Sequence, residues 1–301
     1  MPGMSDLHVR NEKKAHHLSG RRRFLGKLAA VPFIGSIAAP SYGTDLEECT
    51  SLKRVNALLV SATTMAGGKS LEHAEEGLKI LYKDIQRILL INFASLPPAR
   101  DAYAARMQRD FSRIDARFKV DSLHASSLKD AGKVLKDAEA VYVSGGNTFL
   151  LLRELYDRDA VDLLRERILG GMPYSGASAG SNLAGINIGT TNDFPLVDVP
   201  TRRALGILPA IFNPHHPDPD AEKEFASRQY KIGQYTRYHP TEAVVGVNNA
   251  GMISIRGDQL SLKGAGGYAT VQLDDKSELV SDKKDGNISR AISRLREEES
   301  Q

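Results

Sequence analysis

The 301-residue sequence contains a single cysteine, Cys49. One cysteine excludes an intrachain disulfide and any metal site built from several thiolates. The sequence also lacks an uninterrupted apolar run of 18 residues, so no segment predicts a helix that spans a membrane. With 41% hydrophobic and 26% charged residues, the composition is that of a folded globular protein rather than a disordered one.

Net charge is also scarce, at a formal +3 at pH 7, and it is unevenly distributed. Residues 1–39 contain seven lysines and arginines against two acids, a net charge of +5, which leaves −2 for the rest of the chain. A body with a slight negative charge lacks the basic surface that binds a phosphate backbone. Nucleic acid is therefore not expected as a partner.

The basic residues of the N-terminus precede a short apolar stretch. Arg21–Leu25 has the sequence RRRFL, residues 28–39 are mostly apolar, and small residues close the stretch. This order is typical of a secretory signal, and paired arginines before Phe-Leu resemble the bacterial twin-arginine signal. We expect a twin-arginine-type signal and spacer over residues 1–45, passage through the twin-arginine export machinery, and a periplasmic or secreted protein with no stable membrane insertion after processing. A disordered basic tail with a short buried helix is the alternative.

From residue 53 onward, short apolar runs alternate with amphipathic stretches. The apolar runs predict five strands, at residues 55–61, 88–93, 120–123, 140–143 and 172–176. The stretches between and after them predict four helices, at residues 70–86, 99–114, 127–138 and 148–169. Continuous apolar strands that alternate with helices predict an α/β fold with an open, mostly parallel sheet and helices on both faces, of the flavodoxin-like or amidotransferase-like kind.

The pattern changes after residue 182. Residues 186–220 are rich in Pro, Asn, Asp and Thr, and they predict long loops around one strand near Ile211. Further strands are predicted at residues 243–248, 252–256 and 259–263, the last two as a late β-hairpin. We expect one catalytic domain over residues 46–275 and a charged, peripheral C-terminal tail over residues 276–301.

The most specific motif is Gly176–Gly180, which has the sequence GASAG and fits G-x-S-x-G at the end of a predicted strand. Small residues on both sides of Ser178 let the chain turn sharply, as a nucleophile elbow requires. The turn raises the Ser178 hydroxyl above the sheet and directs the Ala179 N–H towards an oxyanion. A small-residue crossing from strand to helix gives the same pattern, so the motif needs a base nearby to indicate catalysis.

A serine nucleophile needs a base, and five histidines lie beyond the predicted signal. His215 follows an apolar run, where a loop can hold an imidazole over the carboxyl edge of the sheet. Asp193 is the nearest acid in the loop between Ser178 and His215, and it can orient the imidazole. The 37 residues from Ser178 to His215 are too few for an α/β-hydrolase. The position of Cys49, close to the predicted signal, excludes the cysteine chemistry of glutamine amidotransferases.

Together these motifs resemble peptidase E, the bacterial aspartyl dipeptidase family, which is a serine-peptidase branch of the amidotransferase-like α/β proteins. The resemblance extends from about residue 56 to residue 267. It rests on separate motifs that occur in register, namely Lys69–His73, Gly145–Phe149, Ser178–Ala184, Thr190–Asp193 and Asn213–His215.

The resemblance implies a role for each of these site residues. Ser178 is the nucleophile, His215 the general base and Asp193 its acidic partner. The backbone N–H groups of Gly146 and Ala179 form the oxyanion hole. The implied reaction is the hydrolysis of dipeptides and short acidic peptides after an N-terminal aspartate, and it needs neither a metal nor a cofactor.

Three further residues are candidate substrate contacts. Arg228 matches, after a one-residue gap, an arginine expected to bind the substrate carboxylate, and Asn147 lies beside the predicted oxyanion hole. The third, Asn249, stands where the family usually has a Glu that competes with the aspartate for the histidine. An amide oxygen can accept from an imidazole N–H, but it stabilises imidazolium less than a carboxylate does. The sequence leaves open whether Asp193 or Asn249 contacts His215.

Three other interpretations fit parts of the pattern. A cyanophycinase-like hydrolase of aspartate-arginine polymers shares the elbow, although the motifs follow peptidase E more closely. A catalytically silent, amidotransferase-like binding protein would account for Asn249. A metal hydrolase could use the histidines and aspartates of residues 215–220, but prolines alternate with the acids there and favour a stiff surface loop.

Overall fold

The structure is a computed structural model that describes residues 53–283 and 285–297. The twin-arginine-type signal and spacer expected over residues 1–45 lie outside these ranges and stay a prediction. Among the described helices, none combines the length and the apolar character needed to cross a membrane.

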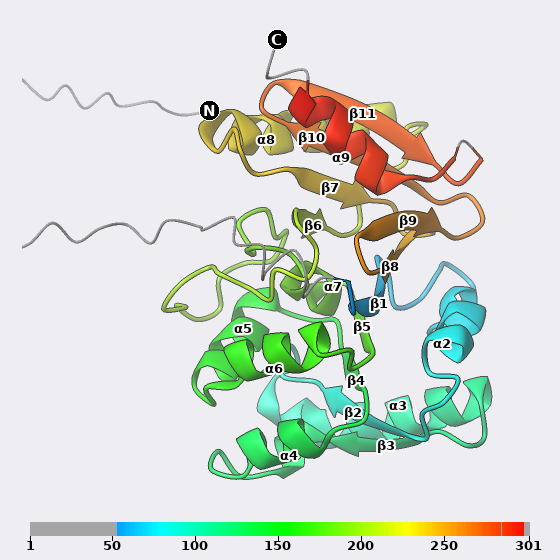
Figure 1. The fold of residues 1–301 in the computed structure, drawn as a ribbon, viewed down its shortest axis with the longest axis vertical. Helices are drawn as coiled ribbons and strands as arrows, with labels where there is room; N and C mark the ends of the chain where they lie inside the picture. The colour runs from blue at the N-terminus through cyan, green and yellow to red at the C-terminus, as the bar shows by residue number, and fades with distance from the viewer. Residues whose placement is uncertain (1–52, 284, 298–301) are drawn as a thin grey trace, which may run out of the picture. The chain divides into compact units, whose positions relative to one another are not determined.

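The larger of two sheets has seven strands in the order β3-β2-β4-β5-β1-β8-β9 (Figure 1). The first five strands of this order run parallel, whereas β8 and β9 are antiparallel to their neighbours. The strands are β1 (Asn56–Val60), β2 (Arg87–Ile91), β3 (Lys119–Ser122), β4 (Val141–Val143), β5 (Tyr174–Ala177), β8 (Met252–Arg256) and β9 (Gln259–Lys263). The predicted open, mostly parallel α/β sheet and its late hairpin are confirmed.

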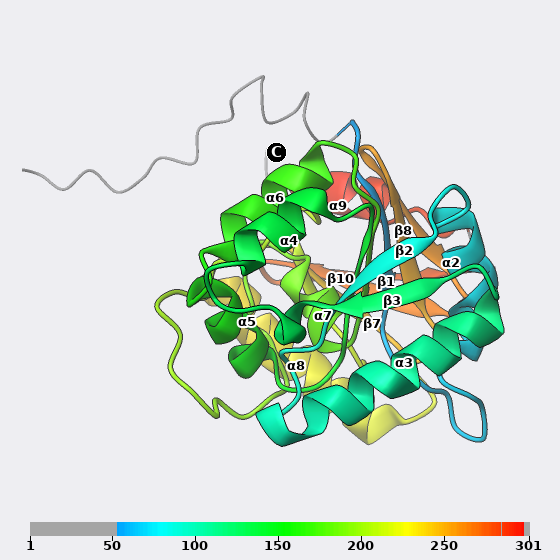
Figure 2. The ribbon, with the colours of Figure 1, turned by 90° about the horizontal axis from the view of Figure 1, so that it is seen from below.

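Helices cover both faces of this sheet because its central strands are apolar on both sides (Figure 2). Along β1, Leu58 and Val60 pack with α2 and α3, whereas Ala57 and Leu59 belong to the core on the opposite face. The helices are α2 (Glu75–Leu81) and α3 (Arg100–Ile114) on one face, and α4 (Ala131–Asp137), α5 (Thr148–Tyr156) and α6 (Ala160–Leu169) on the other.

The single helix expected over residues 148–169 is instead two helices. The break falls at Asp159, whose backbone is left-handed with φ of 50°. An aspartate adopts this conformation more readily than most residues. Asp159 is the N-cap of the second helix, and the first helix ends before it, at Tyr156. The apolar periodicity continues through the break, since both helices pack on the same core, so the periodicity alone did not reveal it.

The smaller sheet has four strands in the order β11-β10-β7-β6. β6 and β7 are parallel, and the other pairs are antiparallel. Two helices pack on this sheet, and one of them also contacts β9. The elements are β6 (Ile211–Asn213), α8 (Glu222–Tyr238), β7 (Val244–Val247), β10 (Tyr268–Leu273), β11 (Lys276–Ser281) and α9 (Ile288–Glu297).

The expected peripheral tail over residues 276–301 is therefore wrong for its described part. β11 pairs with β10, and α9 packs against both and against β9. The buried residues of α9 recur at helical spacing within a charged sequence, so the charge of the segment conceals an apolar stripe. They are Ile288, Ala291, Ile292 and Leu295.

The contact between α7 (Ala179–Leu183) and the sheet gives a stability prediction. A Cβ added to Gly180 would lie 2.2 Å from the carbonyl oxygen of Val143, whereas one added to Gly132 in α4 would meet nothing closer than 3.9 Å. We expect Gly180→Ala to destabilise the protein by about 1–3 kcal/mol, because backbone must move to accommodate the methyl group. Gly132→Ala should be neutral or stabilising by up to about 1 kcal/mol. Urea unfolding of the full chain measures both, and equal midpoints for the two variants would contradict the packing described.

Candidate active site

The turn between β5 and α7 places Ser178 at the carboxyl edge of the large sheet. Its backbone has φ of 51° and ψ of −110°, a strained conformation for a residue with a side chain. The Ser178 N–H donates to the carbonyl oxygen of Val60, at the end of the adjacent strand β1 (3.0 Å). The sequence predicted this elbow, and a strained turn of this kind exposes the hydroxyl above the sheet.

His215 and Asn249 complete a chain of hydrogen bonds with Ser178. The Ser178 Oγ lies 2.8 Å from His215 Nε2, and His215 Nδ1 lies 2.7 Å from Asn249 Oδ1. His215 follows β6 and Asn249 follows β7, so both come from the smaller sheet. His215 and Asn249 are exposed and Ser178 is partly exposed, so the group opens to solvent.

The amide fixes the protonation of the ring. Because an amide oxygen can only accept, Nδ1 of His215 must carry the hydrogen in this arrangement. Nε2 is then free to accept the hydroxyl proton of Ser178. This is the tautomer that a general base requires, so the three side chains can together activate a serine.

Asp193 does not contact His215, contrary to the expectation. Its Oδ2 accepts hydrogen bonds from the backbone N–H of Thr148 (2.7 Å) and from the Thr148 hydroxyl (2.6 Å). Thr148 is the first residue of α5, where the N–H groups lack partners within the helix and attract a negative charge. Asp193 therefore anchors its loop to α5, and Asn249 takes the place beside the imidazole.

The loop after β4 lies against the elbow. A Cβ at Gly145 would be 3.1 Å from the Ser178 Cβ, and one at Gly146 would be only 2.4 Å from the carbonyl oxygen of Ala94. With φ of 136°, Gly146 has a backbone that other residues rarely adopt. Gly146 is exposed, and Ala179 is the first residue of α7. Of the two expected oxyanion-hole residues, Ala179 directly follows Ser178, and Gly146 directly follows Gly145, whose backbone approaches Ser178.

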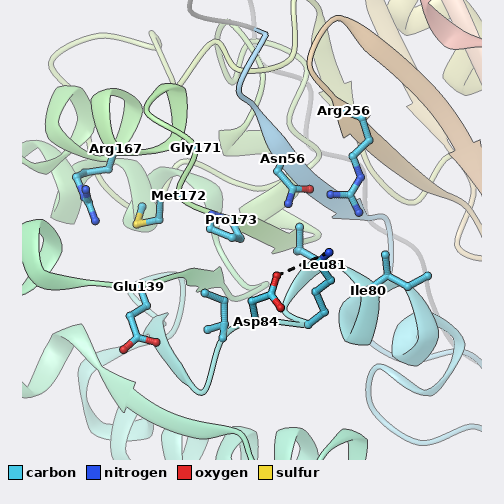
Figure 3. Close-up of a pocket in the computed structure, with 12 residues that line it drawn as sticks. Asn56, Ile80, Leu81, Asp84, Glu139, Arg167, Gly171, Met172, Pro173 and Arg256 are labelled. Carbon is cyan, nitrogen blue, oxygen red and sulfur yellow. Dashed lines mark ion pairs between the residues drawn. The ribbon is translucent and has the colours of Figure 1, made fainter.

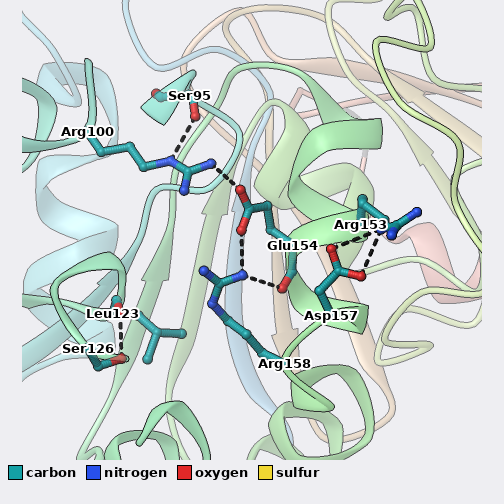
Figure 4. A network of polar contacts seen from close by, with 8 residues as sticks. All are labelled: Ser95, Arg100, Leu123, Ser126, Arg153, Glu154, Asp157 and Arg158. Carbon is teal, nitrogen blue, oxygen red and sulfur yellow. Dashed lines mark hydrogen bonds and ion pairs between the residues drawn. The ribbon is translucent and has the colours of Figure 1, made fainter. Parts of the chain in front are cut away.

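A partly buried ionic network supports the segment against which this loop packs (Figure 4). Glu154 of α5 accepts from Arg100 (2.6 Å) and also pairs with Arg158. Arg100 in turn donates to the carbonyl oxygen of Ser95 (3.0 Å), in the segment after β2. The neighbouring Ala94 carbonyl accepts the backbone N–H of Asn147 (2.9 Å). The paired charges thereby fix the segment on which Gly146 rests.

The Asn147 side chain is occupied by contacts within the protein. Its Oδ1 caps α5 by accepting from the Leu150 N–H (3.0 Å), and its Nδ2 donates to the Phe194 carbonyl (2.8 Å). These bonds join α5 to the loop that carries Asp193. The Asn147 side chain thus bonds to other parts of the protein, which indicates a structural role in place of the expected substrate contact.

Arg228 lies in a pocket of about 390 Å³ next to the His215 loop. Its guanidinium donates to Asn213 Oδ1 (2.8 Å), two residues before His215, and burial lowers its pKa. Lys231, one turn further along α8, lines the same pocket. Two cations in a pocket beside the reactive group suit a carboxylate ligand.

His216 is not an alternative base. It is buried, its ring packs edge-on against Phe225, and burial lowers its pKa. The metal-hydrolase interpretation finds no support either, because the part of the chain that the structure describes holds no group of three or more His, Cys, Asp or Glu side chains placed to bind a metal.

A larger pocket of about 670 Å³ lies elsewhere (Figure 3). It is lined by residues that precede or begin the strands, such as Asn56, Glu139 and Pro173, and it is therefore at the amino edge of the parallel sheet. No residue of the Ser178 group lines it. Open α/β sheets bind their ligands at the carboxyl edge, where Ser178 lies.

Comparison with known proteins places this site in a family. Residues 57–263 match the sequence profile of Peptidase family S51. The chain belongs to peptidase family S51. Peptidase E of Shewanella oneidensis is 37% identical over 211 residues, and that of Shewanella denitrificans is 35% identical over the same length. Each match covers 70% of this chain and 88% of the relative.

Solved structures support the fold of this S51 member. A peptidase E-type protein from Listeria monocytogenes EGD-e aligns with a TM-score of 0.55 at 22% identity, covering 70% of this chain and 99% of that one. A peptidase from an acI-B1 Actinobacterium aligns with a TM-score of 0.55 at 17% identity, covering 76% and 96%. The resemblance to the peptidase E family that the motifs indicated is confirmed.

The Asn249 contact predicts a specific pH effect. In Asn249→Asp, a carboxylate of the same shape would face His215, and a negative charge favours the protonated imidazole. More alkaline conditions are then needed to free the base. We expect the acidic limb of the pH profile of kcat/KM to move upward by about one pH unit.

The matched control is Asp193→Asn, which removes a charge that lies at Thr148 rather than at His215. It should leave the acidic limb in place and instead lower the free energy of unfolding, by about 1–3 kcal/mol. If the acidic limb moves in Asp193→Asn and stays in place in Asn249→Asp, then Asp193 and not Asn249 is the partner of His215.

Proposed function

We propose that this S51 peptidase is a serine exopeptidase that hydrolyses dipeptides and short peptides with an N-terminal aspartate. The observation that carries the proposal is the unbroken hydrogen-bond chain from Ser178 through His215 to Asn249, at a strained elbow. The two Shewanella relatives, both named peptidase E, support the same activity class.

The proposed reaction proceeds through an acyl-enzyme. Ser178 Oγ attacks the carbonyl carbon of the first peptide residue while its proton passes to Nε2 of His215. The oxyanion lies between the N–H groups of Gly146 and Ala179. The C–N bond breaks as His215 gives the proton to the leaving amine. A water that His215 deprotonates then attacks the ester, which releases the first residue as a free acid and restores Ser178.

The preference for aspartate is assigned to the Arg228 pocket. The resemblance to the family implied an arginine that binds the substrate carboxylate, and Arg228 is the candidate. It is held beside the His215 loop by its hydrogen bond to Asn213. A guanidinium stays charged at neutral pH even where burial lowers its pKa. A substrate carboxylate in this pocket would make a charge-assisted hydrogen bond with it.

A panel of dipeptides tests the reaction. We expect the full-length protein to cleave Asp-Leu far faster than Glu-Leu, Ala-Leu or β-Asp-Arg, with release of the free N-terminal amino acid measured by amino-acid analysis. Ser178→Ala should reduce the rate by at least about 10³-fold, as removal of a nucleophile does. Cleavage of β-Asp-Arg alone would favour the cyanophycinase-like hydrolase. If the wild-type protein cleaves none of these dipeptides, the result would favour the interpretation as a catalytically silent binding protein.

Specificity has its own test at Arg228. Arg228→Gln should lower kcat/KM for Asp-Leu by about 10–100-fold, which corresponds to the loss of a hydrogen bond to a charged group. Any slow cleavage of Ala-Leu should stay within twofold, because that substrate has no side-chain carboxylate. Equal losses for both peptides would show that Arg228 supports the fold of the His215 loop and does not select the substrate.

A further inference from the structure

Ser61 directly follows β1 and is fully buried between the two sheets. Its backbone N–H donates to the carbonyl oxygen of Gly251 (3.2 Å), and its hydroxyl donates to the carbonyl oxygen of Val247 (2.9 Å). The same hydroxyl oxygen accepts the backbone N–H of His215 (2.8 Å). The Ser61 side chain therefore contacts both the His215 backbone and Val247. Together with the Ser61 N–H, it binds two points of the segment that connects β7 of the smaller sheet to β8.

The two carbonyl groups flank the turn that carries Asn249. Val247 is the last residue of β7, and Gly251 closes the turn by donating to the Asn248 carbonyl (2.9 Å) before β8 begins. Because Ser61 makes a hydrogen bond on each side of this turn, it fixes the position of Asn249 relative to the end of β1. Its bond to the His215 N–H fixes the imidazole relative to the same point.

The His215 backbone needs such a restraint. It is left-handed, with φ of 56°, a conformation that is unfavourable for a residue with a Cβ. Strained conformations persist only where surrounding contacts determine them. The Ser61 hydroxyl is the contact made by the N–H of this residue.

Ser178 is hydrogen-bonded to the same segment of chain. Its N–H donates to the carbonyl oxygen of Val60, which directly precedes Ser61. The end of β1 thus binds the backbones of Ser178 and His215 and both sides of the Asn249 turn. The relative positions of the three groups depend on two consecutive residues, of which only Ser61 uses its side chain.

We infer that Ser61 is a positioning residue that aligns His215 between Ser178 and Asn249. The inference rests on the proposed function for its kinetic test only, because the hydrogen bonds of His215 can also be observed without substrate. Ser61 is buried and is absent from the residues that line the Arg228 pocket, so it acts through His215 rather than on the peptide.

Ser61→Ala removes the hydroxyl and leaves a side chain of nearly the same size. The Val247 carbonyl keeps the His216 N–H as a donor (2.9 Å), whereas the His215 N–H loses its acceptor. We expect kcat for Asp-Leu to fall by about 10–100-fold, because a displacement of about 1 Å at a catalytic group has effects of this size. KM should stay within twofold. Ser61→Thr, which keeps the hydroxyl, should recover most of the lost kcat.

Thr236→Val is the matched control for stability. The Thr236 hydroxyl is also buried, and it donates to a backbone carbonyl, that of Asp274 (2.5 Å). Thr236 lies in α8 and is not among the residues that line the Arg228 pocket. We expect it to lower Tm about as much as Ser61→Ala while kcat stays within twofold of wild type. A matching fall of kcat in Thr236→Val, or an unchanged kcat in Ser61→Ala, would overturn the positioning role.

NMR of the protein labelled with ¹⁵N-histidine keeps the inference separate from the proposed function. In the wild-type protein we expect His215 as the single tautomer with hydrogen on Nδ1, and in Ser61→Ala a mixture of tautomers or a broadened signal. Ser61→Thr should restore the single tautomer. Identical His215 signals in wild type and Ser61→Ala would refute the inference even if Asp-Leu is cleaved. A changed signal with no cleavage by the wild-type protein would refute the peptidase proposal alone.

Discussion

The close approach of two glycines on either side of Ser178 is the constraint on which the site depends. A Cβ at Gly176 would lie 2.5 Å from the Gly180 carbonyl, and one at Gly180 would press on the backbone of β4. Only hydrogen atoms fit between these segments, so the chain can leave β5 and enter α7 within one residue. The strain falls on Ser178, and the buried Ser181 hydroxyl secures the turn through bonds to the Val60 and Gly176 carbonyls (2.7 and 2.8 Å).

A neutral amide beside the imidazole changes how the site can work. Asn249 fixes the ring and its tautomer as well as a carboxylate does, because both present an oxygen to Nδ1. It supplies no negative charge for the imidazolium that would form in the proposed reaction when Ser178 is deprotonated. In the proposed reaction, stabilisation of the transition state must then rely more on the oxyanion hole and on binding of the substrate by the cations of the Arg228 pocket.

The sequence predicted the elements with strong local signals. The apolar strands, the elbow at Ser178 and the loop histidine were found because each leaves a pattern within about ten residues. Asn249 was noticed only as a departure from a family pattern, and its distance to His215 depends on how β6 and β7 pair. Asp193 was assigned to the imidazole because it was near in sequence, yet the free N–H of Thr148 binds it. Ser61 gave no signal, since a serine that follows an apolar strand is common.

The packing of the last part of the chain was also not predictable from its sequence. The apolar stripe of α9 lies in a segment whose charge predicted a peripheral tail, and the hairpin of β10 and β11 completes a sheet whose partners are distant in sequence. Long-range pairing of this kind has no local periodicity of its own, so it emerges only when the whole chain is folded.

The Ser178 group is divided between the two sheets. Ser178, the proposed nucleophile, and the proposed oxyanion hole belong to the parallel sheet, whereas His215, the proposed base, and Asn249 lie on loops of the smaller sheet (Figure 1). Evolution can therefore vary the two halves separately. A change in the turn after β7 alters the strength of the base and leaves the elbow, with its intolerant glycines, intact. Within an otherwise preserved S51 framework, a carboxylate could thus give way to Asn249 by a single local exchange.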